Sequence, residues 1–323
     1  MKITTNITNT YFDVGRFKGD DDVRDFCRRH RLDGFELLPY EVNTLGVVPA
    51  DMVVGVHLSY CNCWVDFWTG NLDDILEEYG DLETVRQVLG ADRSEFVEKY
   101  RLQLDFAESI GAKYVVFHVS DVSMEEALSY SFKHSDEQVI EATVELINEM
   151  LDGGGYSFMF LVENLWWPGL TMTSPDNTRR LLEGIHYNNK GIMLDTGHLM
   201  HTNNYLSSQE EAIEYIHKML DMHGELCRYI KGMHLQQSLT GDYVRRLIAD
   251  PPSPPEAGTY YERMGLMYPY INGMDKHLPF TAKGVRGLVE RINPDYLTYE
   301  FITRGREEQE EFVSRQNLAL WGE

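Results

Sequence analysis

The segment GIMLDTGH, residues 191–198, is an apolar run that ends in two potential metal ligands, Asp195 and His198. The run MVVGVHLS ends in a similar way around His57, and the run FMFLVEN ends around Glu163. Continuous apolar runs of this length are typical of parallel strands with both faces covered. Several segments that each deliver a ligand as the strand ends indicate one mouth at which strand ends converge.

Nine side chains of this kind are distributed along the chain. Neutral imidazoles and carboxylates are the ligands that Zn²⁺, Mn²⁺ and similar divalent ions require. An isolated histidine after a strand is usually a hydrogen-bonded core or surface residue, but an ordered set favours a metal site. Asp275 and His277 are the least typical members, because they lie in a long connection. The nine candidate ligands are His57, His118, Glu163, Asp195, His198, His234, Asp275, His277 and Glu300.

Strand and helix patterns alternate from one end of the chain to the other. The predicted strands are residues 2–6, 34–39, 52–58, 113–119, 157–163, 191–196, 229–235 and 296–301. The predicted helices are residues 20–31, 93–110, 136–151, 174–186, 208–226, 281–292 and 306–320. This order predicts an α/β fold, a single (β/α)8 TIM barrel with the metal site at its C-terminal mouth. An open doubly wound sheet is the alternative, but it would not bring ligands from the second half of the chain back beside His57.

The single predicted domain, residues 1–323, carries two loop insertions, near residues 60–92 and 236–280. The first begins with the aromatic-rich YCNCWVDFW, and the second contains the proline-rich PPSPPEAG at 251–258. Long connections in a compact barrel are usually functional or disordered. Since both follow strands, we expect them to wall the pocket on the ligand-bearing face.

Composition restricts the partners. The formal net charge is −23, whereas binding to a nucleic-acid backbone usually needs a basic face, so nucleic acid is not an expected partner. No apolar run is long enough to cross a membrane, and the N-terminus MKITTNITNTYF has no apolar signal core. The four cysteines form no familiar disulfide framework. We therefore expect a cytoplasmic protein that makes no membrane contact.

Short motifs carry a resemblance to a known superfamily. They are HLSY at 57–60, FHVS at 117–120, LVEN at 161–164, LDTGH at 194–198, MHLQQS at 233–238, DKH at 275–277 and YE at 299–300. With these motifs the chain resembles the xylose isomerase-like TIM-barrel superfamily over almost its whole length. Within it, the chain is most similar to the endonuclease IV group (AP endonuclease family 2) and to related sugar isomerases and epimerases. Because related barrels often pair, a homodimer is implied.

The endonuclease IV resemblance implies two or three Zn²⁺ ions, with Mn²⁺ as the alternative. It assigns a first ion to His57, His118 and Glu163. A second ion would share Glu163 and be completed by a set of three residues, and a third would be held by another set of three. Those sets are Asp195, His234 and Glu300 for the second ion, and His198, Asp275 and His277 for the third.

The implied activity is metal-assisted phosphoester hydrolysis, and we expect a small phosphorylated or sugar-like substrate. The alternative is a sugar or sugar-phosphate isomerase or epimerase, in which one ion suffices and Glu163 and Glu300 act as the acid/base pair. A DNA-repair AP endonuclease and a non-catalytic metal-binding protein are the lesser alternatives. Under either enzymatic hypothesis Glu163 and Glu300 are the expected catalytic residues.

Four further residues are candidates for substrate contact. Tyr60 stands where the endonuclease IV group has a residue that helps to open DNA. Trp166 and Trp167 follow Glu163 directly, and they could stack on a sugar or base or pack against a neighbouring loop. Glu36, in GFELLPY, ends the second predicted strand, where it could contact a substrate hydroxyl or form a structural ion pair.

Overall fold

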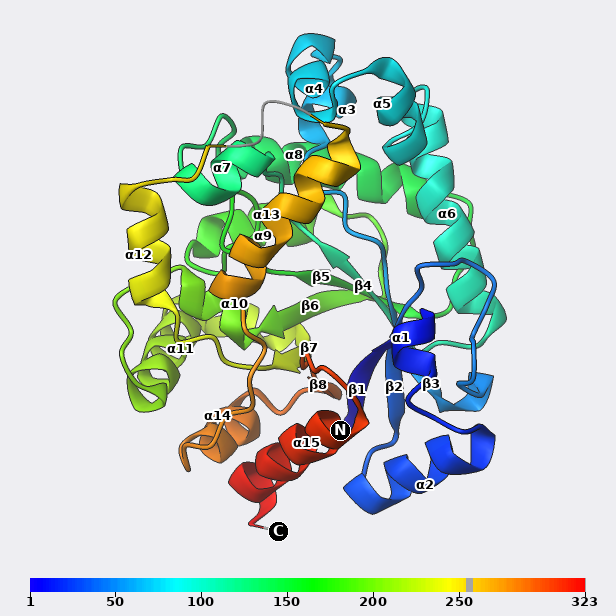
Figure 1. Cartoon of the computed structure of the whole chain (residues 1–323), viewed down its shortest axis with the longest axis vertical. Coiled ribbons are helices and arrows are strands. Elements are labelled where there is room, and N and C mark those ends of the chain that lie inside the picture. Colours follow the sequence, from blue (N-terminus) through cyan, green and yellow to red (C-terminus); the bar gives the residue numbers. More distant parts are fainter. Residues whose placement is uncertain (254–257, 323) are drawn as a thin grey trace.

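Eight parallel strands, hydrogen-bonded in sequence order, close into a barrel, in a computed structural model that describes residues 1–253 and 258–322. The strands are β1 (Lys2–Thr8), β2 (Gly34–Leu38), β3 (Val53–His57), β4 (Tyr114–His118), β5 (Met159–Glu163), β6 (Lys190–Asp195), β7 (Ile230–Leu235) and β8 (Tyr296–Tyr299). The ring is completed by the pairing of β1 with β8 (Figure 1). This confirms the predicted (β/α)8 barrel and all eight predicted strands.

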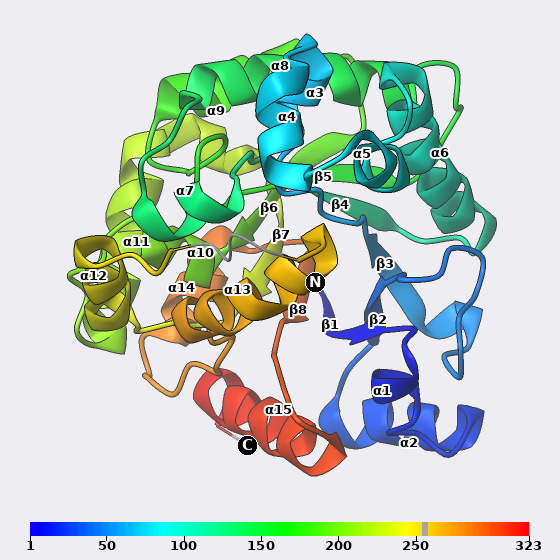
Figure 2. The same ribbon diagram turned by 45° about the horizontal axis from the view of Figure 1, so that its top comes forward.

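Helices surround the barrel and cover the outer faces of its strands. The covering helices are α2 (Asp20–His30), α6 (Arg93–Ser109), α8 (Asp136–Leu151), α9 (Pro175–Gly184), α11 (Gln209–His223), α14 (Val285–Ile292) and α15 (Arg306–Trp321) (Figure 2). Each overlaps one of the predicted helices. The helix predicted to reach residue 226 ends at His223, because Gly224 has a positive φ and the chain continues as a 3₁₀ turn, η2 (Gly224–Tyr229). Ser174 caps α9 as its sequence indicates.

Side chains inside the barrel follow the two-residue period of its strands. A cluster of five apolar residues from β3 to β6 fills the interior. Counting two residues at a time toward the carboxyl end, Tyr114 and Val116 lead to His118 on β4, and Leu161 leads to Glu163 on β5. The candidate ligands are therefore the uppermost inward-facing layer of a packed core. The five cluster residues are Val54, Tyr114, Val116, Leu161 and Met193.

The two insertions are largely helical. The first contains α3 (Val65–Thr69), α4 (Leu72–Tyr79) and α5 (Leu82–Val88), and the second contains α12 (Gly241–Ala249) and α13 (Tyr260–Met274). Residues 254–257 of the proline-rich run lie outside the described residues. The remaining short elements are α1 (Tyr11–Val14), η1 (Ala50–Met52), α7 (Met124–Ser129) and α10 (Thr196–His201).

The insertions meet each other above one side of the barrel. The ring of Tyr260 on α13 lies 4.7 Å from the ring of Tyr79 on α4, and its hydroxyl donates to Asn62. Arg263 of α13 donates to the backbone carbonyl of Glu78, and the Glu78 carboxylate accepts from the backbone N–H of Met124 at the start of α7. We call α3–α5, α7 and α13 the roof.

None of the helices in residues 1–253 and 258–322 combines the length and the hydrophobicity that crossing a bilayer requires.

Candidate metal centre

Strand ends position most of the candidate ligands. His57, His118, Glu163 and Asp195 are the last residues of β3, β4, β5 and β6. The Asp195 carboxylate also caps α10 by accepting from the backbone N–H of His198 at 2.6 Å, so a short sharp turn brings that histidine back over the mouth.

The remaining ligands come from the second half of the barrel. His234 is in β7, and Glu300 follows β8 directly. Asp275 is the C-cap residue of α13, and His277 has a left-handed backbone with φ 46°. An isolated bridge between Gln237 and Leu278 holds the Asp275–His277 segment beside the end of β7. The long connection is therefore fixed where it passes the site.

The nine candidates gather into three sets, and within each set the ligand atoms lie within 4.8 Å of one another. These are the groupings that the endonuclease IV resemblance implies, and all three ions could be held. The sets are His57, His118 and Glu163; Glu163, Asp195, His234 and Glu300; and His198, Asp275 and His277.

Glu163 lies at the centre of the cluster and is fully buried. Its Oε2 lies 3.0 Å from Nε2 of His57 and 3.2 Å from Nε2 of His118. Its Oε1 lies 3.1 Å from Nδ1 of His234 and 3.3 Å from Nδ1 of His198. One carboxylate thus faces ligands of different sets with its two oxygens, which is the arrangement needed to bridge two ions.

Several ligand atoms are buried without a hydrogen-bond partner among the described residues. They include Oδ2 of Asp195, Oε2 of Glu300 and Nε2 of His118. A buried carboxylate oxygen without a donor carries a desolvation cost, and a divalent cation would remove that cost. The chemistry of the donor set therefore fits a metal cluster.

The electrostatics of the cluster reflect close packing of carboxylates and imidazoles. Burial would raise the pKa of Glu163, but His234 and His118 hold it well below its usual range. Burial would lower the pKa of His234, but Glu163 and Glu300 hold it well above its usual value. For Asp195, burial raises the pKa, with a contribution from Glu300. The pKa of His118, by contrast, is lowered by burial. Metal ligands bind in their deprotonated form, so metal binding at this cluster would release protons.

Glu36 does not occupy the position expected of a substrate contact. It is fully buried, and it pairs in register with Gly55, two residues before His57 on β3. It therefore lies one layer beneath the ligands. Its carboxylate contacts Nε2 of His234 at 2.9 Å and accepts from Tyr114 and Thr298. Its burial and its contact with His234 favour the structural ion pair over substrate contact.

A fourth set of nearby ligand atoms includes Glu36 with His57, His234 and Glu300. We assign Glu36 as the partner of His234, because it faces the Nε2 of that ring whereas Glu163 and Glu300 face Nδ1. A carboxylate on the far nitrogen of a ligating histidine fixes the tautomer and the ring orientation.

Three polar residues that support the ligands were not identified from the sequence as functional. The Asn164 side chain donates to the backbone carbonyl of Asp195 and accepts from its N–H. Gln236 donates to the carboxylates of Asp195 and Asp275, and Ser238 donates to Asp275 at 2.9 Å. The motifs LVEN and HLQQS contain all three, so their place beside ligands was the available signal.

The aromatic candidates lie against the ligands. Tyr60 contacts His118 edge to face with 4.8 Å between ring centroids. The ring of Trp166 lies 5.2 Å from that of His198, and Trp167 packs on Trp166 at 4.2 Å. Both indoles are buried, so in this structure they pack over the third set. Substrate contact by these three residues stays a prediction.

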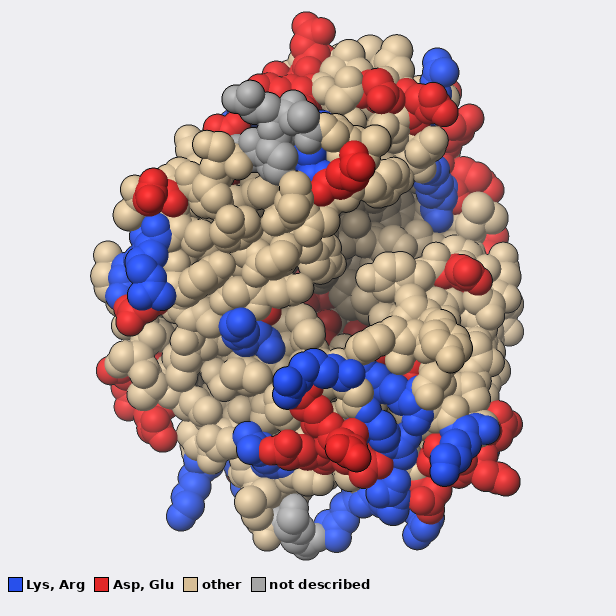
Figure 3. Space-filling model, viewed as in Figure 1, with Lys and Arg blue, Asp and Glu red and all other residues tan. Residues whose placement is uncertain are grey.

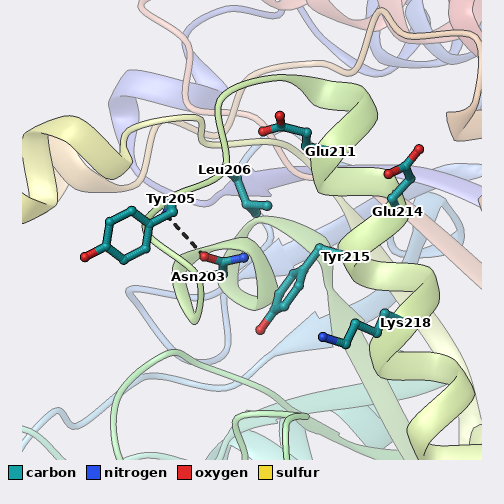
Figure 4. Close-up of a pocket in the computed structure, with 7 residues that line it drawn as sticks. All are labelled: Asn203, Tyr205, Leu206, Glu211, Glu214, Tyr215 and Lys218. Carbon is teal, nitrogen blue, oxygen red and sulfur yellow. Dashed lines mark hydrogen bonds between the residues drawn. The ribbon is translucent and has the colours of Figure 1, made fainter.

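Figure 3 shows the mouth as a hollow with acidic residues on its floor, largely uncharged walls and a group of Lys and Arg residues along one edge. In the same view, the ribbon of α13 crosses the region beside this hollow (Figures 1 and 3). A separate hollow of about 520 Å³ lies on the outer surface, between α11 and the connection that precedes it (Figure 4). None of the nine candidate ligands lines that second hollow, whose lining residues are Asn203, Tyr205, Leu206, Glu211, Glu214, Tyr215 and Lys218.

Comparison with known proteins agrees with the barrel fold. A family model described as a xylose isomerase-like TIM barrel matches residues 87–310. No curated protein matches the chain. Among solved structures, a 3-keto-D-glucoside 4-epimerase from E. coli is 15% identical, with 99% of this chain and 98% of that chain covered and a TM-score of 0.52. Endonuclease IV from Thermus thermophilus is 14% identical, with 100% of both chains covered and a TM-score of 0.52.

Proposed function

The chain belongs to the xylose isomerase-like TIM-barrel family, and from this premise we propose that it is a divalent-metal-dependent hydrolase that cleaves a phosphoester bond in a small phosphorylated or sugar-like substrate. The observation that carries this proposal is the gathering of nine ligands into three adjoining sets. An enzyme that only moves a proton beside a carbonyl needs one ion. The buried residues His57, His198 and Asp275 would then have no ion to hold.

Bound divalent ions would polarise a phosphoryl group, acidify water and neutralise the leaving oxygen. The protein's own contribution is to hold the reacting groups in place. Glu163, which faces two sets, would orient the attacking water and accept its proton. His198, Asp275 and His277 would bind the phosphate end of the substrate through their ion, and the indole of Trp166 would exclude bulk water from that side.

The position of the roof is an argument that the substrate is small. Contacts between Tyr260 and Tyr79, and between Arg263 and Glu78, join the two insertions above one side of the mouth. These contacts narrow the approach to the ligands from that side, which favours a small substrate over a rigid duplex. The net charge of −23 disfavours a nucleic-acid polymer for a separate reason, since it would repel the phosphate backbone.

A sugar isomerase or epimerase is the second candidate. The observation in its favour is that Glu163 and Glu300 lie on one side of His234, with oxygens 3.1 and 3.3 Å from its Nδ1. Two carboxylates around one ion are suited to removing a proton from one face of a carbon and returning it on the other. The likeness to the E. coli epimerase concerns the fold alone, so a sugar substrate for this chain is part of the proposal.

Metal content and isotope exchange separate the two candidates. We expect protein purified without chelator to hold two or three ions per chain, and to hydrolyse a member of a phosphoester panel. Glu163→Gln should abolish that hydrolysis, whereas Glu183→Gln, on the exposed face of α9, should not. One ion per chain, together with solvent deuterium entering a sugar carbon, would instead establish the epimerase hypothesis. Protein that binds no ion would refute both.

A further inference from the structure

His201 is a buried histidine close to the third set that the ligand assignment leaves out. It is the last residue of α10 and lies three residues after His198, so both rings project from the same face of the helix. It is 3% exposed. Its Nε2 lies 3.5 Å from Oδ1 of Asp275 and has no hydrogen-bond partner among the described residues. Buried polar atoms normally have a partner, so this nitrogen is available for an interaction with Asp275.

The two oxygens of Asp275 face different surroundings. Oδ2 lies 3.3 Å from Nε2 of His198 and 2.6 Å from Nε2 of His277, the other two members of the third set. Oδ1 faces away from them and accepts from Ser238 at 2.9 Å and from Gln236 at 3.4 Å. His201 approaches this outer oxygen. The carboxylate is therefore oriented, with Oδ2 toward the other ligands of the third set and Oδ1 toward hydrogen-bond donors.

The position of His201 is held by packing. The ring of Trp166 lies 4.7 Å from the ring of His201 and 5.2 Å from that of His198, so one indole covers both histidines. Behind His201 lies a small cavity, which Ser238 and Asn204 also line. His201 is not a member of the set whose ligand atoms lie within 4.8 Å of one another. This geometry suits a residue that acts through Asp275 more than one that binds an ion itself.

We propose that His201 is a positioning residue for the third ion. It donates from Nε2 to Oδ1 of Asp275, so that Asp275 presents Oδ2 alone to the ion shared with His198 and His277. Partners of this kind orient a ligating carboxylate and typically change metal affinity by about 10- to 100-fold. The inference rests on the proposed three-ion site, because it assigns a role within the third set.

The test measures ion affinities directly. Apo protein prepared by chelation is titrated with Zn²⁺ against a chromophoric chelator, which yields a dissociation constant for each ion. His201→Phe keeps a ring under Trp166 but removes the donor. We expect one of the three dissociation constants to rise roughly 10- to 100-fold while the other two stay unchanged. His201→Gln, whose Nε2 reaches a similar point, should recover most of the lost affinity.

The control is His223→Phe, since His223 is also buried at the end of a helix but bonds to Thr178 and Met219. It should leave all three constants unchanged. His201→Asn, too short to reach Asp275, replaces the Phe variant if that protein does not fold by circular dichroism. Equal constants in His201→Phe and wild type, or a Gln variant as weak as the Phe variant, would overturn the inference. A wild-type protein with two sites would overturn this inference alone, one with a single site or none would overturn the proposed function as well, and the wild-type titration by itself separates these cases.

Discussion

Glu36 is the carboxylate partner of the candidate ligand His234. It contacts Nε2 of that ring at 2.9 Å, and Tyr114 and Thr298 donate to its carboxylate. Glu36→Gln keeps the size of the side chain but removes its charge. We expect it to lower the affinity of the second set for its ion by roughly 10- to 100-fold. Zinc titration against a competing chelator measures this. Glu183→Gln on the surface is the matched control, and an unchanged affinity in Glu36→Gln would show that the pair serves packing alone.

Gly55 makes a second residue-scale test of the layer beneath the ligands. A Cβ at this position would lie 2.1 Å from the ring of Tyr114, the residue that donates to Glu36. The ring is fully buried and cannot move aside freely. We expect Gly55→Ala to lower the free energy of unfolding by about 1–3 kcal/mol through overpacking, as measured by urea denaturation.

The matched control for that substitution is Gly287→Ala. Gly287 lies in α14, and a Cβ there would meet nothing within 4 Å. Alanine is the better helix former by up to about 1 kcal/mol, so this variant should be equal to wild type or slightly more stable. A Gly55→Ala protein as stable as Gly287→Ala would contradict the close packing of Tyr114 against β3.

At the residue scale the sequence predicts the ligands but not their supports. His118 and Glu163 could be found because an acid or imidazole that ends an apolar strand is costly to bury unless a cation or a hydrogen bond compensates it. Glu36 closes a similar run, yet it lies one layer lower. That difference depends on the register of β2 against β3, which shifts between Phe35 and Glu36. Register across a closed barrel is a property of the whole sheet, so a single strand's sequence does not reveal it.

At the scale of elements the strands were predictable and α13 was not. Apolar residues occur all round this helix: Tyr260 and Met267 are buried, whereas Tyr261 and Leu266 are exposed. The sequence therefore shows no apolar stripe with a 3.6-residue period. A proline such as Pro269 inside the segment also normally argues against a helix. Contacts with α4 and α7 stabilise α13 in place, and such tertiary contacts lie outside what local patterns convey.

Glu78 makes the roof sensitive to pH. Burial raises the pKa of its carboxyl to about 7, although the N–H of Met124 opposes this. In the unfolded chain the same group has an ordinary pKa near 4.3, so between these values the folded state binds more protons. Stability from this group is therefore present at low pH and is lost as pH rises to about 7. The loss can reach about 4 kcal/mol.

Glu78→Gln stays neutral throughout, so we expect its melting temperature to fall less than that of wild type between pH 5 and pH 8. Thermal unfolding monitored by circular dichroism at several pH values provides the comparison. Glu77→Gln changes the exposed neighbour on α4 and should keep the wild-type pH dependence. Parallel curves for wild type and Glu78→Gln would mean that this carboxyl is solvated and does not carry the effect.

At the scale of the whole molecule, the negative charge should repel polyanions such as DNA. With a net charge of −23, we expect no binding to duplex DNA with or without an abasic site. Fluorescence anisotropy at low ionic strength is the appropriate measurement, because phosphate contacts are strongest there. Endonuclease IV serves as the positive control. Binding that weakens steeply as salt is added would revive the DNA-repair alternative.

The same acidity links metal binding to stability. The ligand sets gather carboxylates and imidazoles around Glu163, and ions that bind only the folded state stabilise it by mass action. At an ion concentration of about 100 times the dissociation constant, each site adds about 2.7 kcal/mol. We therefore expect the melting temperature to fall by several degrees in excess chelator and to recover when Zn²⁺ is restored. Glu163→Gln, which removes the carboxylate shared by two sets, should lose most of this response and keep the part due to His198, Asp275 and His277. A melting temperature indifferent to chelator in the wild-type protein would mean that the gathered ligands hold protons instead of cations, and that the centre is a buried ion-pair network.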